Sequence, residues 1–321
     1  MYTDYGDEET WLLHRTAGFG IGASATPAIL GKSPYRGPWA VWCAHKAPHL
    51  TKPVGAFVRD GNDLEPAVVR MFARREGLTL HHHEFGVYQH PRIEWLRFSP
   101  DATLGESLET PRHHFEIKCV MSPEVASHLP PSGDMPLDRF TVPHWAYQGL
   151  HQLAVCPSLR GVTIVALLPW FEIRTYRIDR TPETRKAIGI IATRVRDWRE
   201  RYLVGDEMPE ADDSVHCSMY MDWSNPAPKD WSKNAKKRPQ RTATEAEARW
   251  AYQYSVERQE EKRAKSQASK ARNMLLETIG DAYRLELPCG GSVKVSSHSS
   301  RRVTVEDKRR DNIEQPNQGK S

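Results

Sequence analysis

The stretch RFSPDATLGESLETPRHHFEIKC, residues 97–119, contains two acids and a lysine near the ends of predicted strands. Asp101 follows Ser-Pro, and after a polar segment FEIKC brings Glu116, Ile117 and Lys118. Side chains at i and i+2 of a strand lie on one face, so Glu116 and Lys118 point together while Ile117 points into the core. We predict that Asp101 lies on the adjacent strand, close to the other two charged groups.

This arrangement is typical of metal-dependent phosphodiester hydrolysis. Mg²⁺ prefers oxygen ligands, usually one or two carboxylates with water completing the shell. Asp101 and Glu116 would supply the carboxylates, and the Ile117 backbone carbonyl a third oxygen. The metal would act as a Lewis acid and lower the pKa of its bound water. Lys118 would orient that water or meet the charge that develops on phosphorus.

The same residues also fit a surface strand with a salt-bridged Glu and Lys. The pattern of one acid followed at a distance by E-x-K is short, and the three residues alone do not exclude that alternative. The choice between the two interpretations therefore depends on the rest of the chain.

The 321 residues suffice for one large domain or two modest ones, with 27% charged and 39% hydrophobic residues. Residues 229–272 hold thirteen Lys and Arg against six Asp and Glu, a net charge of +7. Because the net charge of the whole chain is +4, the remaining residues have a net charge of −3 and are slightly acidic. A basic segment beside an acidic body suits nucleic-acid contact, but equally a solvated helix.

Membrane insertion and export are not indicated. No apolar run is long enough to span a bilayer, and the N-terminus lacks a signal-peptide layout. The five cysteines are scattered and form no CxxC pair, which predicts reduced thiols and no iron–sulfur cluster. We expect a cytoplasmic protein with no membrane partner.

Hydrophobic periodicity predicts an α/β domain over residues 1–210, in the order α-β-β-β-α-β-β-α. The expected helices are a pair within 27–46, the second beginning at Pro38, followed by 62–77, 142–155 and 181–203; the expected strands are 84–90, 95–99, 114–121, 161–170 and 171–179. Asn62 or Asp63 is the expected N-cap of the third helix, and Gly77 its end. Trp39, Trp42 and Trp145 are expected in the core.

The composition of the chain changes after residue 210. Residues 211–242 are predicted to be a basic, Pro-rich linker. Residues 243–305 are predicted to form a long charged helix and a β-hairpin that turns at Gly290-Gly291, and residues 306–321 a disordered tail. We expect His81, His82 and His83 to be solvated, because adjacent residues cannot all face one zinc ion.

Five motifs occur in one order along the chain: GIGAS…AILGKSPY at 20–35, GNDLEP at 61–66, FSPD at 98–101, FEIKC at 115–119 and WAYQGLHQLAV at 145–155. This series resembles the phage lambda-type exonuclease family, also called YqaJ-like viral recombinases, of the PD-(D/E)xK nuclease superfamily. The resemblance covers about residues 11–205. It implies a restriction-endonuclease-like α/β core, a central mixed sheet flanked by helices, with residues 243–305 as an extension.

The resemblance also implies roles for individual residues. Asp101 and Glu116 match the metal ligands, with the Ile117 carbonyl beside them, and Lys118 matches the catalytic lysine. The other matched residues are Glu65, which helps to place metal and water; Gln148, which packs over the active site; and Ser24 and Arg15, which receive the terminal 5′ phosphate. Ala102 stands where a glycine often follows SPD, a minor departure.

Three of these matched residues also have an ordinary interpretation. Glu65 is an acid that the N-terminal half of a helix favours. Ser24 would cap the helix that follows it. Gln148 would be an ordinary polar helix residue. Only the resemblance favours the functional roles over these.

The family implies a Mg²⁺-dependent exodeoxyribonuclease on linear double-stranded DNA, with Mn²⁺ as a substitute metal. Its members resect 5′ to 3′ and leave 3′ overhangs for annealing recombination. They work with a single-strand annealing protein, and some form a ring-shaped homotrimer. A phage or prophage origin would place this chain in the host cytoplasm. The alternatives are an endonuclease of the same superfamily, or a non-catalytic DNA-binding or assembly protein that retains the scaffold.

Overall fold

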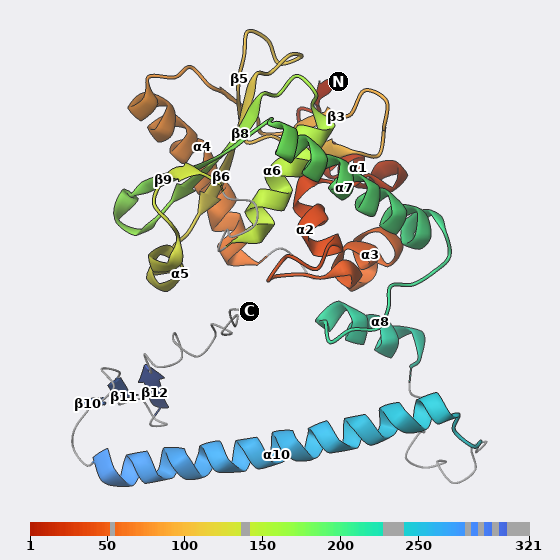
Figure 1. The fold of residues 1–321 in the computed structure, drawn as a ribbon, viewed down its shortest axis with the longest axis vertical. Coiled ribbons are helices and arrows are strands. Elements are labelled where there is room, and N and C mark those ends of the chain that lie inside the picture. The colour runs from red at the N-terminus through yellow and green to blue at the C-terminus, as the bar shows by residue number, and fades with distance from the viewer. Residues whose placement is uncertain are drawn as a thin grey trace, which may run out of the picture. The chain divides into compact units, whose positions relative to one another are not determined.

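The computed structural model describes residues 1–51, 55–135, 142–226, 241–279, 284–287, 292–296 and 302–306. The chain divides into compact units, Met1–Lys229 and Asp230–Ser321. Figure 1 shows the elements of each unit. Among the described residues, no helix combines the length and the apolar character needed to cross a membrane.

The first unit is built on a central mixed sheet. In the described residues it has six strands in the order β2 (His81–His82), β5 (Ala102–Leu104), β6 (His113–Cys119), β8 (Gly161–Leu167), β9 (Ile173–Asp179) and β7 (Gly133–Asp134). β6 pairs with β8 in parallel, as β9 does with β7, and the other pairs are antiparallel. The predicted α/β core with a central mixed sheet flanked by helices is confirmed (Figure 1).

Helices cover both faces of this sheet because its inner strands are apolar on both sides. β8, GVTIVAL, is buried along its whole length. Val162, Ile164 and Ala166 pack in the cluster that contains Leu150 and Leu153 of α6 (Pro143–Val155). Their neighbours along the strand, Val165 and Leu167, pack instead with α4 (Ala56–Glu76). The site therefore lies in a sheet that is held from both sides.

The N-terminal segment adds a smaller antiparallel sheet and a layer of short helices. The sheet consists, in the described part of the chain, of β1 (Tyr2–Asp4), β3 (Gly86–Gln89) and β4 (Arg97–Phe98). The remaining elements of this unit are α1 (Glu8–Thr16), η1 (Ala17–Phe19), η2 (Ala23–Ala25), α2 (Thr26–Ile29), α3 (Pro38–Lys46), η3 (Pro48–Leu50), α5 (Pro123–His128), η4 (Pro169–Phe171), α7 (Pro182–Arg199), η5 (Glu200–Val204) and α8 (Val215–Ser224). α3 begins at Pro38 as predicted.

The three tryptophans expected in the core are buried there: Trp39, Trp42 and Trp145. The Trp39 indole N–H donates to the Glu210 carbonyl at 2.8 Å, and that of Trp42 to the Tyr202 carbonyl at 3.0 Å. A buried indole N–H needs such an acceptor. These bonds fasten α3 to the segment after α7.

Two local expectations are wrong. α4 begins at Ala56, with Gly55 as its N-cap, and not at residues 62–63; it continues through Pro66, whose missing N–H removes one helical hydrogen bond, and ends at left-handed Gly77 as predicted. His83 is buried, although His81 and His82 are exposed. Its ring nitrogens lie 2.8 Å from the Tyr2 hydroxyl and 2.8 Å from the Thr103 hydroxyl.

The segment predicted to be a linker, 211–242, contains α8, whose Cys217 is buried in the main core. Residues 227–240 of that segment lie outside the described residues. The predicted boundaries of the domains stay predictions, and α8 shows that the first unit contains structure beyond residue 210.

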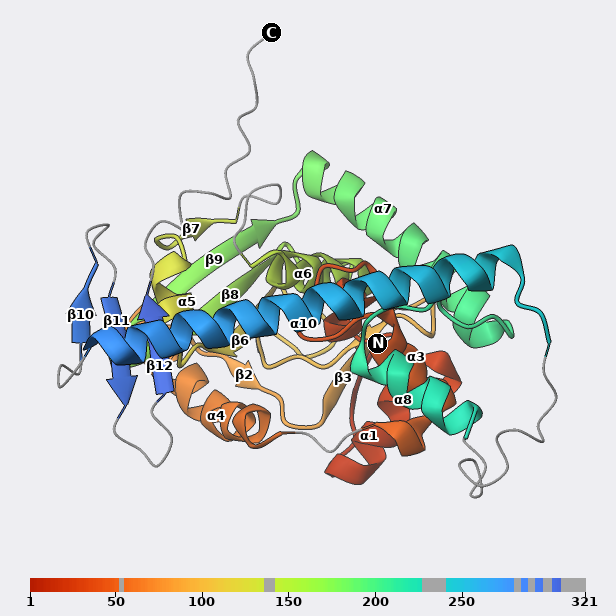
Figure 2. The ribbon, with the colours of Figure 1, turned by 90° about the horizontal axis from the view of Figure 1, so that it is seen from below.

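The second unit contains α10 (Glu245–Ile279), β10 (Arg284–Glu286), β11 (Ser292–Ser296) and β12 (Arg302–Glu306). Figure 2 shows α10 as one continuous helix. β11 pairs antiparallel with β10 and with β12, so the described residues form one strand more than the expected hairpin. The expected turn at Gly290-Gly291 lies outside the described residues. Of the expected tail, 306–321, Glu306 is the last residue of β12 and the rest lies outside the described residues.

Candidate active site

β6 brings the predicted catalytic groups together at the point where β5 begins. The register pairs Ala102 with Phe115, and one further step of this register puts Asp101, the residue before β5, opposite Glu116. The Ile117 N–H donates to Asp101 Oδ2 at 2.7 Å. The predicted approach of Asp101 to the E-x-K segment is therefore present, although Asp101 precedes its strand.

The Glu116 carboxylate is buried under α6. Oε1 accepts hydrogen bonds from Lys118 Nζ at 2.5 Å and from the Gln148 amide. Oε2 accepts one from Gln152 Nε2 at 2.5 Å, and His114 Nε2 lies 3.4 Å away. Gln148 and Gln152 are one helical turn apart and so share a face of α6. The helix thus holds this carboxylate in one orientation.

The electrostatics of the site favour a divalent cation. Burial raises the pKa of Asp101 well above its usual value, and repulsion from Glu116 and Glu65 raises it further. Burial lowers the pKa of Lys118, but attraction to Glu116 and Asp101 outweighs this and leaves the pKa above its usual value. Lys118 is therefore an ammonium group. The carboxyl groups of Glu116 and Glu65 disfavour a negative charge on Asp101, and a bound cation would relieve this repulsion.

The Ile117 carbonyl also faces this site. In a strand, the N–H and C=O of one residue point to the same edge. Because the Ile117 N–H points to Asp101, its carbonyl lies on the Asp101 edge too, beyond the last β5–β6 register pair. The described residues contain no group of three or more His, Cys, Asp or Glu side chains that could hold a metal. Asp101, Glu116 and this carbonyl form an oxygen set that fits Mg²⁺, which commonly keeps several waters.

Glu65 of α4 joins the site from the other face of the sheet. Its charge acts on both Asp101 and Lys118, and its Oε1 lies 3.4 Å from His82 Nε2. The side chain remains 23% exposed, so it can still reach solvent or a ligand. The structure thus brings together the acids and the lysine that the sequence analysis singled out.

Ser24 and Arg15 lie near a third group, Arg36. The Arg36 guanidinium donates to the Ser24 hydroxyl at 2.9 Å and to the Ser24 carbonyl at 2.8 Å. Burial lowers the pKa of Arg15, repulsion from Arg36 lowers it further, and attraction to Asp101 raises it. The Arg15 guanidinium also lies 4.3 Å from the centre of the Trp11 ring, a cation–π contact. Arg36 thus binds Ser24, and the charges of Arg36 and Asp101 both act on Arg15.

Sequence reasoning missed three residues of this site. Gln152 follows Gln148 at i+4 and His114 precedes Glu116 at i−2, so helix and strand periodicity could have identified both. Arg36 had no comparable signal, because its contact with Ser24 depends on how the loop before α3 returns to η2. His114 Nδ1 and Gln152 Oε1 are buried polar atoms without a partner among the described residues.

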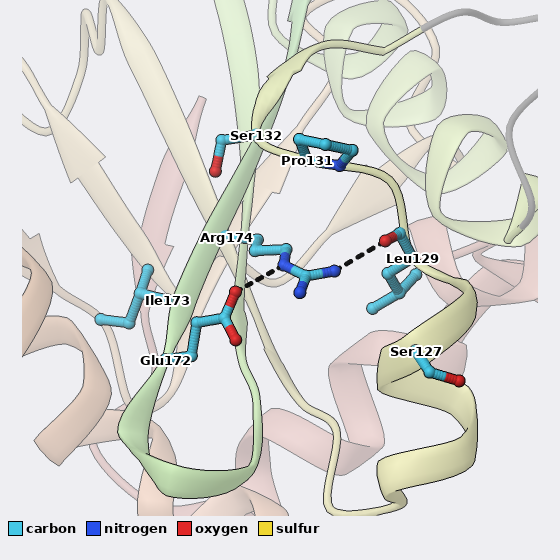
Figure 3. A pocket seen from close by; sticks show the side chains of 7 residues that line it. All are labelled: Ser127, Leu129, Pro131, Ser132, Glu172, Ile173 and Arg174. Atoms are coloured by element: carbon cyan, nitrogen blue, oxygen red, sulfur yellow. Dashed lines mark hydrogen bonds and ion pairs between the residues drawn. The ribbon is translucent and has the colours of Figure 1, made fainter.

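A pocket of about 400 Å³ lies elsewhere, between α5 and β9 (Figure 3). Arg174 is central to it, but its guanidinium already pairs with Glu172 at 2.7 Å and donates to the Leu129 carbonyl at 2.6 Å. Asp101, Glu116 and Lys118 do not line this pocket. This pocket is therefore separate from the candidate active site.

Comparison with known proteins gives a family for part of the chain. Residues 10–158 match the family described as "YqaJ-like viral recombinase domain". None of the curated proteins matches the chain.

Solved structures that match part of the chain include an alkaline exonuclease from Laribacter hongkongensis. It is 18% identical, with a TM-score of 0.44, over 61% of this chain and 94% of that one. The structure of the same enzyme in complex with dAMP is 17% identical, with a TM-score of 0.45, over 61% of this chain and 94% of that one. A phage-related exonuclease from Haemophilus somnus 129PT is 12% identical, with a TM-score of 0.40, over 60% and 98% of the two chains.

Proposed function

We propose that the chain is a Mg²⁺-dependent exodeoxyribonuclease, and the match of residues 10–158 to the YqaJ-like viral recombinase domain supports this proposal. Its substrate would be linear double-stranded DNA. It would degrade one strand from the 5′ end and leave a 3′ overhang for annealing recombination, together with a single-strand annealing protein. A ring-shaped homotrimer and a cytoplasmic location belong to the same proposal.

The observation that carries this proposal is the meeting of Asp101, Glu116 and Lys118 beside the Ile117 main chain. A salt-bridged surface strand, the alternative interpretation, would leave these groups in water. Glu116 is instead only 4% exposed and is held by a lysine, two glutamines and a histidine. Removing a carboxylate from water is costly even when it has hydrogen-bond partners. Buried charged groups of this kind cluster at functional sites, so the burial of Glu116 favours a functional role over a structural one.

In the proposed mechanism Asp101, Glu116 and the Ile117 carbonyl would hold Mg²⁺, with Mn²⁺ as a substitute. When bound, the metal supplies Lewis acidity and a water of lowered pKa. Lys118 acts as a cation and not as a base, because its raised pKa keeps it protonated at neutral pH. Its ammonium group stabilises the negative charge that develops on the phosphate. Glu65 orients the attacking water, and Gln148 keeps Glu116 in place.

The proposed specificity for a 5′-phosphorylated end rests on Ser24, Arg15 and Arg36. Guanidinium groups remain charged at neutral pH and often bind phosphate through two parallel hydrogen bonds, in a bidentate arrangement. The electrostatic influence of Asp101 on Arg15 supports a short path between these residues and the proposed metal ligands. A terminal phosphate bound there would place the first phosphodiester bonds near the carboxylates.

The first test is hydrolysis of a 5′-phosphorylated linear duplex with Mg²⁺. Lys118→Ala and Glu116→Ala should each abolish digestion, while both variants still bind the duplex in a gel-shift or anisotropy assay. Wild-type protein should leave covalently closed circular DNA intact. Full activity of either variant would remove this mechanism.

Cleavage of the circle would favour the endonuclease alternative. Binding of DNA without digestion by the wild type, at any Mg²⁺ or Mn²⁺ concentration, would favour the non-catalytic alternative. The same linear and circular substrates therefore distinguish all three functions.

A further inference from the structure

The two units of the chain differ in charge. Residues 230–321 contain 20 Lys and Arg against 13 Asp and Glu, a net charge of +7, whereas residues 1–229 contain 25 against 28. The unit that holds the candidate active site is thus slightly acidic, although its proposed substrate is a polyanion. A duplex carries one negative charge per about 1.7 Å of its axis, and basic side chains supply most non-specific affinity for it.

The positive charge of the second unit is concentrated in one part of α10. From Lys262 to Leu276 the sequence has no acid, and the next one is Glu277. The basic residues of this segment are all exposed: Lys262, Arg263, Lys265, Lys270 and Arg272. At 1.5 Å per residue they extend over about 15 Å of the helix axis, a length that spans several phosphates.

These residues share one side of the helix, which we name the basic face. At about 100° per residue, they fall within about 180° of the helix circumference, with Ser266 and Ser269 between them. The opposite side, about 60° wide, carries small or apolar residues. Those residues are Ala264, Ala268, Ala271 and Leu275. The helix therefore presents positive charge and short polar side chains in one direction.

Two ordinary explanations for a basic helix segment do not account for this one. Cations favoured by the helix dipole lie in the last turn, but α10 ends at Ile279 and the basic face begins seventeen residues earlier. Pairing within the helix neutralises Lys265, which lies 2.5 Å from Glu261. Among the described residues, however, Lys262, Arg263 and Lys270 form no ion pair. Lys262 and Lys270 have no acid at i±3 or i±4.

We propose that the basic face of α10 binds the phosphate backbone of double-stranded DNA. The proposal rests on DNA being the substrate and identifies a surface that holds it outside the active site. Because the contact is with phosphates, it should be independent of base sequence and sensitive to salt. It would keep the duplex bound to the protein while successive bonds are cleaved.

The experiment compares the full-length wild type with a variant that carries Lys262→Gln, Arg263→Gln and Lys270→Gln. Glutamine is a good helix former, so α10 should persist, and circular dichroism would verify this. Binding to a linear duplex is measured by anisotropy at several NaCl concentrations in EDTA, where hydrolysis cannot occur. Each lost phosphate contact should reduce the slope of log K against log salt by about 0.9, so three should reduce it by about 2.7.

A matched control carries Arg185→Gln, Lys186→Gln and Arg194→Gln, which remove the same charge from exposed positions of α7. The control should keep the wild-type slope. An unchanged slope in the α10 variant, or an equal change in both variants, would overturn the proposal. A changed oligomeric mass with an unchanged slope would also overturn it, and would show that α10 contacts another copy of the chain instead.

Failure here is distinguishable from failure of the proposed function. Binding in EDTA does not depend on catalysis, and digestion at low salt does not depend on the basic face. If the wild type digests DNA and the slopes are equal, only the role of α10 is wrong. If the wild type never digests DNA and the slopes differ, the DNA contact stands without the nuclease.

Discussion

At the scale of single residues, Glu116 is the group on which the others converge. Its two oxygens accept charge-assisted hydrogen bonds from Lys118, Gln148 and Gln152, and such bonds are about twice as strong as neutral ones. Gln152 is completely buried and reaches the oxygen that faces away from Lys118. Side chains that orient a metal ligand, the role that we propose for Glu116, commonly matter nearly as much as the ligand.

We expect Gln152→Leu to raise the Mg²⁺ concentration needed for half-maximal activity and to lower the rate tenfold to a hundredfold, by about the usual effect of removing such a partner. Leucine fills a similar volume but cannot donate to Glu116. The rate is measured against Mg²⁺ concentration, and metal affinity is measured separately by calorimetry without DNA. Thermal unfolding would verify that the variant is folded. If the rate of the Gln152→Leu variant depended on Mg²⁺ concentration as the wild-type rate does, this role of Gln152 would be contradicted.

At the scale of elements, the distance between α6 and the sheet determines whether the two glutamines reach Glu116. Gly149 lies between them, on the side of α6 that faces the sheet. A Cβ added there would lie 2.6 Å from Ile178 Cδ1 and 3.6 Å from Val162 Cγ1. A larger residue at this position would therefore force Ile178, which is buried in the core, to shift, or α6 to move away from the sheet.

Gly149→Leu should lower the free energy of unfolding by about 1–3 kcal/mol, the usual effect of overpacking a core. It should also reduce activity, because α6 must move away from the sheet and carries Gln148 and Gln152 with it. Urea unfolding and the nuclease rate measure the two effects.

The matched control is Gly189→Leu on α7, where an added Cβ meets nothing within 4 Å. That variant should be as stable as the wild type or slightly more so, since leucine favours a helix over glycine by up to about 1 kcal/mol. Equal destabilisation at both positions would show that packing against the sheet is not the cause.

At the scale of the whole molecule, buried histidines make stability depend on pH. Burial lowers the pKa of five histidines in the described residues to about 4: His45, His83, His113, His144 and His151. Unfolded histidines titrate near pH 6.5. Between these values the unfolded chain binds more protons than the folded one, so stability falls as the pH falls.

We expect the free energy of unfolding to be constant above about pH 7, as far as these histidines are concerned, and to decline from pH 6.5 toward pH 4. His151, which is 1% exposed and bonded to Thr26 and the Arg97 carbonyl, should contribute one proton to the slope. His151→Gln should reduce that slope by up to about 1.4 kcal/mol per pH unit. Urea unfolding at pH 7, 6 and 5 measures both slopes, and identical slopes would contradict the assignment.

The elements of the core were predictable from local periodicity. Alternation along FEIKC places Glu116 and Lys118 on one face of β6, and the helical spacing of 142–155 identifies α6. The start of α4 was not predictable in this way, because Pro66 is typical of a first turn and yet lies inside the helix. The burial of His83 was missed because it depends on Tyr2, eighty-one residues away in the chain.

The sequence by itself determined which face of its strand or helix each side chain occupies. From this periodicity followed the shared face of Glu116 and Lys118, the burial of the three tryptophans and the α/β class of the core. Tertiary structure alone decided that Asp101 meets the Ile117 N–H, that Gln152 and His114 hold Glu116, and that Arg36 binds Ser24. The physical reason is that periodicity is a local property of the backbone. The approach of segments distant in sequence depends instead on how helices and strands pack.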